Sequence, residues 1–512
     1  MSDKKNEQTQ VGWSSFPISE LLAPLDDGRT LHQGWSPRCE KEPSVSETEW
    51  GVLKTTSIQP AAFLPEHNKR LPDHLEPRPQ IEVKPGDILI TCAGPRNRCG
   101  IACLVRATRQ RLMMSGKMYR FRPDPARVDP RYLEAYLQSA DAQAAIDEMK
   151  TGGNESGLNL THDRFRKLLV PVAPLDQQKH IVAEIEKQFS RLDEAVANLK
   201  RVKANLKRYK AAVLKTAVEG RLVETEAEVA RREGRYYETG KQLLQRILET
   251  RRSQWKGKGK YKEPTAPDTT GLPELPDGWV WASAEQISDF ITKGTTPAST
   301  KLSGGAGEVQ FLKVYNLTFD GSLNYTYKPA FVSRKTHEGE LARSRVVAGD
   351  VLINIVGPPL GQVSVVPPAL PEANINQAIA RFRPISPLNS GFLSLTLLTE
   401  EIMRWAMSRA KTTAGQSNLT LEHCRDLPIP LPPFTEQTRI VAEVDHRLSL
   451  IRETEAQVDA NLRRAERLRK GILSSAFSGR LCDQLDRTEV IAIYGENNNN
   501  NANETRTGGM SE

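Results

Sequence analysis

The sequence predicts an α+β fold with a pseudo-twofold internal repeat: two small mixed α/β domains separated by two long helices that pair as an antiparallel coiled coil. One observation is a duplication, because residues 174–184 (PLDQQKHIVAE) return as residues 433–443 (PFTEQTRIVAE). A second is that both copies continue without a gap to a Gly-Arg-Leu, at 220–222 and 479–481. A third is the helical spacing of the apolar residues within both copies. A repeat of this length outranks every local motif in deciding the architecture.

Composition bounds the class of protein. A chain of 512 residues is long enough for roughly three or four domains with real cores. The net charge of +8 and the pI near 9.0 permit a polyanionic partner and favour nucleic acid mildly. The first ten residues are polar, and no run approaches the roughly 18 apolar residues of a membrane span. We therefore expect a cytoplasmic protein.

The two globular modules share a skeleton. The first, residues 12–173, opens at Gly-Trp, and the second, residues 275–432, opens at Leu-Pro-Asp-Gly-Trp. Each has a short apolar strand that follows a Gly-Asp turn and a later Arg-Phe-Arg-Pro stretch. β-Branched runs between Gly, Pro and Asn predict a small sheet in each module. We expect one helix over about 130–150 and its counterpart over about 391–411.

The repeated segments, residues 174–222 and 433–481, predict helices of about 40 residues that Gly220 and Gly479 end. Apolar residues that average close to 3.5 positions apart form a narrow seam, as a coiled coil requires. The first seam also includes Val202, Leu206, Tyr209 and Val213. We expect the two seams to pair with each other in antiparallel fashion, while pairing with another protein stays open. The seam residues are Ile185, Phe189, Leu192, Val196, Leu199, Val444, Leu448, Ile451, Val458 and Leu462.

Two segments fall outside the repeat. Residues 223–274 form an extension and linker with an amphipathic stretch over 242–248 and a basic run over 255–262, which we interpret as solvated linker although it could touch phosphate. Residues 482–512, rich in Asn and Gly, have the composition of a disordered tail.

The sequence offers no catalytic machinery. It has no Gly-rich phosphate loop followed by Lys and Ser or Thr. Leu431 replaces the polar residue that an amino-methyltransferase loop needs before its Pro-Pro-aromatic sequence. Asp73, Glu82 and Lys84 have the residue types of a metal-dependent nuclease, but two prolines separate the acids. Six cysteines make neither a disulfide framework nor a zinc site. We expect no catalytic residue, metal or cofactor on this chain.

Two variable modules, each followed by a Pro-rich helix start with Pro-Leu/Phe-x-x-Gln, resemble the specificity subunit of type I restriction–modification enzymes. The resemblance covers roughly residues 12–481, and its signature is residues 174–178 and 433–437. One departure is Gln177, where the family usually has the glutamate that stands here as Glu436.

The resemblance implies a non-catalytic DNA reader. Each module would be a target-recognition domain for one half of a bipartite, asymmetric site, and the paired helices would set the spacing. Two methylation subunits would use S-adenosylmethionine to methylate adenine, and two restriction or motor subunits would use ATP and Mg²⁺. Alternatives are a single-chain restriction–modification enzyme and a coiled-coil adaptor without DNA contact.

Basic residues within the modules are the candidates for contact with double-stranded DNA, through phosphates or guanine edges. The alternative interpretation of each residue is a solvated surface charge or a phosphate contact without base reading. In the first module they are Arg96, Arg98, Arg106, Arg109, Arg111 and Lys117, and in the second Lys313, Lys328, Arg334, Lys335, Arg343 and Arg345.

Overall fold

The computed structural model of the chain describes residues 13–256, 259–357, 359–409, 411–413 and 416–478. Over these residues the chain divides into two compact units, one formed by residues 13–201 with 458–478 and the other by the described part of residues 202–457. Each long helix takes part in both units. Gly479 and the tail predicted over 482–512 lie outside the described residues.

The first module is built on an antiparallel sheet with the order β10-β8-β12-β2, in which β3 also pairs with β12. Smaller sheets, β11-β4-β7 and β13-β14-β9, flank it, and β5 pairs with β6. The elements are β1 (Ser14–Pro17), β2 (Leu22–Ala23), β3 (Leu31–Gln33), β4 (Gly51–Leu53), β5 (Ile58–Gln59), β6 (Ala62–Phe63), β7 (Asn68–Arg70), β8 (Ile88–Thr91), β9 (Ala93–Gly94), β10 (Ala102–Leu104), β11 (Leu112–Met113), β12 (Met118–Pro123), α1 (Pro130–Leu137), α2 (Ala140–Met149), β13 (Lys150–Thr151), β14 (Leu158–Leu160), α3 (His162–Phe165) and β15 (Leu169–Val172).

The second module repeats the central sheet as β17-β26-β22-β24 and adds a second sheet, β18-β20-β19-β25-β21. A third, β23-β28-β27, completes it. The elements are β16 (Val280–Ser283), α7 (Ala284–Ile287), β17 (Thr292–Lys293), β18 (Ser303–Gly304), β19 (Val309–Leu312), β20 (Ala330–Val332), α8 (Arg334–Glu338), β21 (Arg345–Val347), β22 (Val351–Asn354), β23 (Val356–Gly357), β24 (Val363–Val365), β25 (Glu372–Ile375), β26 (Ile379–Phe382), α9 (Ser390–Leu397), α10 (Glu400–Arg409), β27 (Lys411–Thr413), β28 (Gln416–Asn418), α11 (Leu421–Arg425) and β29 (Pro428–Leu431).

The single helix predicted over 130–150 is wrong, because two helices, α1 and α2, occupy this stretch. The chain breaks at Ser139, whose side chain accepts a hydrogen bond from the backbone N–H of Ala142 and so caps α2. The second module breaks in the same place, between α9 and α10. An N-cap serine inside an apolar pattern is therefore the feature that the prediction passed over.

Each module closes on the start of its long helix through a two-stranded antiparallel pair. In the first module β1 pairs with β15, and in the second β16 pairs with β29. The strand that opens a module thus lies beside the strand that leads into the helix. This arrangement makes each module-plus-helix a closed structural repeat.

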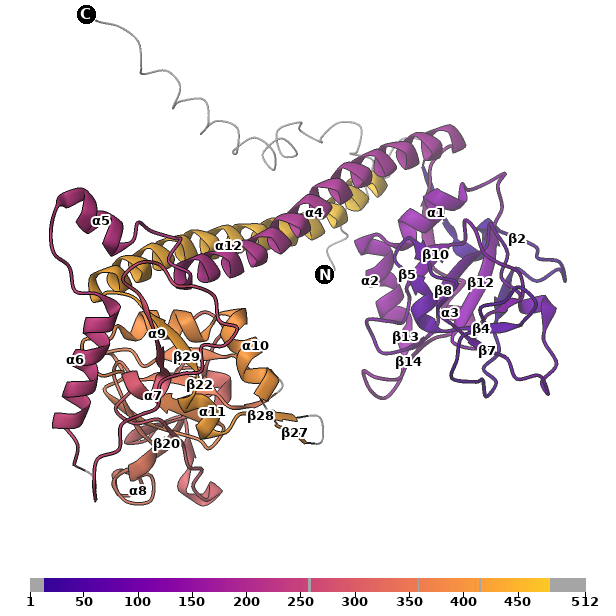
Figure 1. Cartoon of the computed structure of the whole chain (residues 1–512). Coiled ribbons are helices and arrows are strands. Elements are labelled where there is room, and N and C mark those ends of the chain that lie inside the picture. The colour runs from indigo at the N-terminus through magenta and orange to yellow at the C-terminus, as the bar shows by residue number, and fades with distance from the viewer. Residues whose placement is uncertain (1–12, 257–258, 358, 410, 414–415, 479–512) are drawn as a thin grey trace, which may run out of the picture. The chain divides into compact units, whose positions relative to one another are not determined.

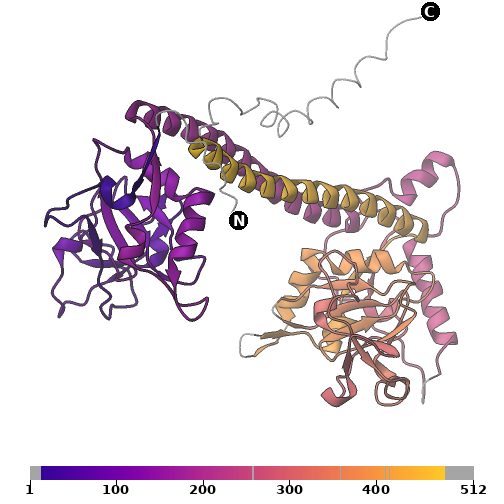
Figure 2. The same ribbon diagram turned by 180° about the vertical axis from the view of Figure 1, so that it is seen from behind.

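The long helices α4 (Leu175–Val218) and α12 (Phe434–Phe477) have 44 residues each. In the first unit the N-terminal part of α4 packs against the C-terminal part of α12, where Arg469 lies 4.2 Å over the ring of Phe189. In the second unit the C-terminal part of α4, with Val213 and Ala217, packs against the N-terminal part of α12, with Ile440. The helices are therefore antiparallel, and they lie side by side in both views (Figure 1 and Figure 2). The predicted fold class is confirmed.

Most residues predicted for the seam are covered. Ile185, Leu192, Val444, Leu448, Ile451 and Val458 are buried, and Phe189, Val196, Leu199 and Leu462 are half-buried. Placing Val202 and Tyr209 on the seam is wrong, since they are 40% and 47% exposed. Tyr209 lies at the edge of the seam, where its hydroxyl accepts a hydrogen bond from Arg447 (3.5 Å), as suits a ring with a polar tip.

The extension is more ordered than a linker. It contains α5 (Glu226–Glu233) and α6 (Gly240–Ser253), both with a capping box at the N-terminus. Leu243 and Ile247 of α6 are fully buried in the core of the second module. Among the described residues, no helix is long and apolar enough to cross a membrane.

Candidate nucleic-acid interface

The repeated signature builds the same junction twice. Gln178 is buried, donates to the carbonyl of Ala173 (2.7 Å) and accepts from the backbone N–H of Asp129 (2.8 Å), the N-cap of α1. Gln437 donates in the same way to the carbonyl of Pro432 (3.0 Å) and accepts from the N–H of Asn389 (3.0 Å), the N-cap of α9. Each glutamine therefore fixes a module on its long helix. Because one backbone partner is a carbonyl and another is an N–H, only a side chain that both donates and accepts can make these bonds.

The residue before each glutamine accepts a hydrogen bond from the indole N–H of a tryptophan. Trp13 donates to Gln177 (3.1 Å) in the first unit, and Trp279 donates to Glu436 (3.0 Å) in the second. Glu436 is fully buried and its second oxygen also accepts from the backbone N–H of Glu226 (2.9 Å), at the start of α5. Burial raises the pKa of Glu436 to about 7. The glutamate thus holds the extension against α12.

A buried carboxylate anchors the central sheet of each module. Asp87 accepts from Arg122 (2.7 Å) and from the backbone of Lys84 (2.7 Å). Asp350 accepts from Arg383 (2.7 Å) and the backbone of Val347 (2.9 Å). The Gly-Asp turns and the Arg-Phe-Arg-Pro stretches of the sequence meet here. Arg122 and Arg383 of those stretches therefore stabilise the central sheets.

In the first module, five of the six cations predicted for DNA contact form side-chain contacts within the module. Arg96 pairs with Glu155 (2.7 Å), and Arg106 pairs with the buried Glu134 (2.6 Å). Arg98 donates to two backbone carbonyls (2.6 and 2.9 Å). Arg96 and Arg106 keep about half of their side chains at the surface, so their contact with DNA stays a prediction.

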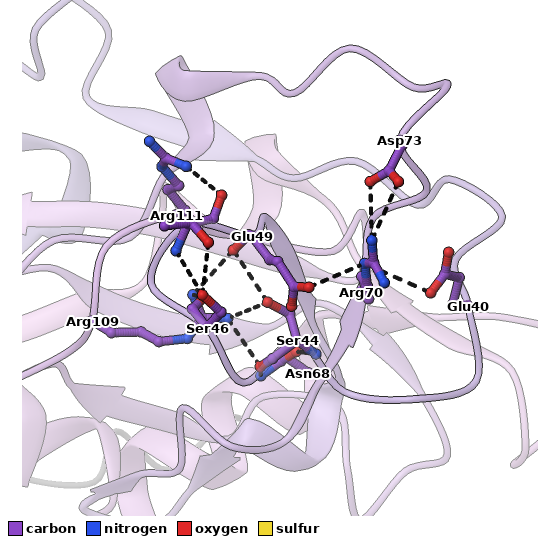
Figure 3. Close-up of polar contacts among 10 residues, drawn as sticks. Glu40, Ser44, Ser46, Glu49, Asn68, Arg70, Asp73, Arg109 and Arg111 are labelled. Atoms are coloured by element: carbon purple, nitrogen blue, oxygen red, sulfur yellow. Dashed lines mark hydrogen bonds and ion pairs between the residues drawn. The ribbon is translucent and has the colours of Figure 1, made fainter.

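Arg109 and Arg111 brace one loop, as Figure 3 shows. Arg109 donates to three carbonyl oxygens of the loop 44–49 (3.1, 3.1 and 3.2 Å), and burial lowers its pKa. Arg111 adopts a φ of +60° and donates to the carbonyl of Thr48. Lys117 is exposed. The structure therefore assigns Arg109 and Arg111 to shaping the loop, and Lys117 remains an exposed candidate for DNA contact.

Four candidates in the second module lie around α8 and β21. Arg334 pairs with Glu372, and Arg345 donates to the carbonyl of His337 (3.1 Å). Lys335 and Arg343 are exposed. The remaining two, Lys313 and Lys328, lie beside exposed aromatic rings.

Sequence reasoning missed two aromatic features. Tyr315 and Tyr327, 39% and 46% exposed, stack edge-to-face beside those two lysines. In the first module Trp35 forms one wall of an open cleft of about 490 Å³, and the guanidinium of Arg78 lies 4.1 Å over its ring. A stretch with tyrosines between two lysines, residues 313–328, was the available signal for the first of these.

The residue types of a nuclease do not come together. Lys84 pairs with Asp26 (2.8 Å), Asp73 pairs with Arg70 (3.2 Å), and Glu82 accepts from the backbone N–H of Arg111. Over the described ranges, no group of three His, Cys, Asp or Glu side chains is placed to hold a metal ion. Leu431, in the sequence that resembled a methyltransferase loop, is fully buried in β29.

Comparison with known proteins gives consistent relatives, although no family model matches. The chain is 36% identical over 198 residues to the type I restriction enzyme EcoEI specificity subunit of Escherichia coli, a match that covers 39% of this chain and 32% of that protein. It is 25% identical over 356 residues to the EcoBI specificity subunit of Escherichia coli, covering 67% and 65%. The EcoKI specificity subunit of Escherichia coli K12 matches at 22% over 491 residues, covering 94% and 93%.

The first two matches thus span about a third and just under two thirds of those relatives. A solved structure from work on complex assembly and conformational transition of the type I R-M system shares the fold, with a TM-score of 0.64 and 18% identity over 93% of this chain and 100% of that one. The resemblance to type I specificity subunits that the repeated signature indicates is therefore confirmed.

Proposed function

We propose that this chain is the DNA specificity subunit of a type I restriction–modification complex that acts on chromosomal DNA in the cytoplasm. Each module is a target-recognition domain for one half of a bipartite, asymmetric site. The paired helices set the spacing between the half-sites and dock two methylation subunits. The observation that carries the proposal is the duplication of a module-plus-helix unit in which the junction repeats atom for atom while the modules diverge.

The chemistry would belong to the partners. S-adenosylmethionine would bind the methylation subunits, and ATP and Mg²⁺ would bind two restriction or motor subunits. The chain would contribute sequence recognition and geometry without a catalytic group. Duplex DNA is a suitable target because its regular rise gives two half-sites a fixed separation. Two modules joined by paired helices can match that separation.

Module exchange tests this proposal. Residues 12–173 are replaced by the corresponding module of a homologue, so that β1 and β15, which pair with each other, move together. Wild-type and hybrid chains are produced with the native methylation subunits in a host that lacks adenine modification, and N6-methyladenine is mapped across the genome. We expect the hybrid to change one half of the methylated motif and to keep the other half.

The chain produced without methylation subunits is the control, and it should leave the host genome unmodified. Methylation by the chain alone would contradict a non-catalytic role. A change in both halves of the motif would show that the modules do not read independently.

A further inference from the structure

Two tyrosines and two lysines form an exposed ridge on the second module, which we call the tyrosine–lysine ridge: Lys313, Tyr315, Tyr327 and Lys328. The two rings are nearly perpendicular, with centroids 5.9 Å apart and an interplanar angle of 86°. The ammonium of Lys313 lies 6.0 Å from the centre of the Tyr315 ring, and that of Lys328 lies 5.3 Å from the centre of the Tyr327 ring. Two adjacent rings thus lie together on the surface, each with one lysine ammonium beside it.

The ridge is held from beneath by one buried side chain. The amide nitrogen of Asn316 donates to the carbonyls of Asn324 and Tyr327, both at 2.9 Å, and its oxygen accepts from the backbone N–H of Lys313 (2.9 Å). Asn316 is 2% exposed, so these bonds are shielded from water. They join the two chain segments that carry the ridge.

Two further features fix its surface. The hydroxyl of Tyr315 donates to the carbonyl of Lys328 (3.0 Å), which leaves the ring as the group that Tyr315 offers outward. Lys328 has a φ of +45°, a left-handed conformation that a side chain other than glycine adopts at a cost. Strained backbone conformations of this kind cluster at sites that bind ligands.

The charges favour a polyanion over a protein partner. Within the described part of the chain, neither Lys313 nor Lys328 forms an ion pair, whereas Lys301, Arg334 and Arg383 of the same module all pair with carboxylates. A cation on an aromatic face keeps its N–H donors free for a phosphate. A ring beside unpaired cations can pack against a nucleotide while the cations contact its phosphates.

We propose that the tyrosine–lysine ridge binds duplex DNA at the half-site of the second module, with the lysines on phosphates and the Tyr327 ring packed against a nucleotide. This rests on the proposed function. Phosphate contacts contribute to the salt dependence of binding, and a ring contact contributes affinity at one position. The two kinds of contact can therefore be measured separately.

The test uses the chain assembled with its methylation subunits and a duplex that carries the motif found by modification mapping. The Lys313→Gln/Lys328→Gln double variant should lower the slope of log affinity against log salt concentration by about 1.8, because each phosphate contact contributes about 0.9. Tyr327→Ala should weaken binding to the motif by roughly tenfold, because the buried apolar contact of the ring with the nucleotide is lost.

Matched controls remove the same groups elsewhere. Lys215→Gln/Lys301→Gln takes the same charge from two lysines that already pair with carboxylates, and Tyr236→Ala removes a ring that is 78% exposed on the extension. Both should bind like the wild-type complex. Equal slopes for the ridge and control double variants would overturn the inference, as would a loss of methylation subunits from the ridge variants at unchanged slope, which would make the ridge a protein contact. If the wild-type complex itself showed no preference for any motif, the proposed function would fail instead.

Discussion

Glu436 and Gln177 occupy the same position of the repeat but accept different numbers of hydrogen bonds. Gln177 is exposed and, among the residues that the structure describes, accepts a hydrogen bond from Trp13 alone, which one amide oxygen can do. Glu436 accepts from Trp279 and from the backbone of Glu226, which takes two acceptor oxygens. The departure from the family pattern at Gln177 therefore coincides with a position that receives one hydrogen bond where Glu436 receives two.

Glu436→Gln should make the stability difference from wild type depend on pH. The carboxyl of Glu436 has a pKa of about 7 in the folded chain, against an unperturbed 4.5, so the folded state holds the proton more tightly. Its contribution is then fully present below pH 4.5 and is lost as pH rises through 7, by roughly 2–3 kcal/mol. The stability of the Glu436→Gln variant does not fall with pH in this way, because an amide does not titrate. Its NH₂ group, however, meets an N–H that the carboxylate accepted from, which costs about 1–3 kcal/mol at every pH.

Urea unfolding of the full chain at pH 5 and pH 8 measures this. We expect Glu436→Gln to be clearly destabilised at pH 5 and close to wild type at pH 8. Gln177→Glu is the control, because a carboxylate at that exposed position should show no such trend. An equal deficit at both pH values would mean that Glu436 is not the titrating group.

The candidate arginines show what the sequence could not supply. It identified Arg98, Arg109 and Arg111 as candidates for contact with DNA, but in the structure their partners are backbone carbonyls on loops some 40 to 65 positions away. Nothing local in the sequence encodes such a contact. Exposed lysines are easier to predict, since a lysine is rarely buried without a partner.

At the scale of the element, the extension is tied to α12 by one buried carboxylate. Glu226 is 1% exposed and accepts from Arg439 and Arg235, both at 2.6 Å. Although burial acts to raise it, the hydrogen bonds from Arg439 and Arg235 hold the pKa of Glu226 below its usual value. The carboxylate is therefore charged at neutral pH and links α5 to the long helix.

Glu226→Ala should release α5 from α12. Removing one partner of a buried ion pair costs roughly 3–5 kcal/mol of stability. Because Arg439 is 37% exposed and solvent screens its charge, we expect a smaller cost of about 2 kcal/mol for Glu226→Ala. Hydrogen exchange of residues 226–233 should then be at least about tenfold faster. Glu233→Ala, on the same helix but at the surface, should leave exchange unchanged. Unaltered protection in Glu226→Ala would show that α6 alone holds the extension.

The elements were predictable to different degrees. The long helices followed from a seam that repeats over many turns, and their bounds agree within a few residues because Gly220, at a φ of +67°, ends the first one. The division into α1 and α2 was not foreseen, since Ser139 interrupts an apolar pattern that otherwise continues. Exposure of Val202 and Tyr209 was also missed, because a periodic pattern does not say how many neighbours cover each position.

For the whole molecule, the antiparallel arrangement predicts that helix length sets the gap between half-sites. Adding seven residues to both α4 and α12 keeps the seam in register, because seven residues make two turns of a coiled coil. The insertions belong after Leu199 and after Val458, beside the points where each helix passes from one unit to the other, so that the packing of each unit is preserved.

The insertion lengthens the pair by about 10.5 Å at 1.5 Å per residue. Because DNA rises about 3.4 Å per base pair, the gap in the methylated motif should grow by up to roughly three base pairs, or by a smaller integer if both modules must still face the groove. The half-site sequences should not change, because the ridge and the other reading surfaces stay within their modules. Modification mapping reads out both quantities at once, and an insertion in α4 alone, which breaks the pairing, serves as the inactive control. An active double insertion with an unchanged gap would mean that some other contact, and not the paired helices, measures the distance along the DNA.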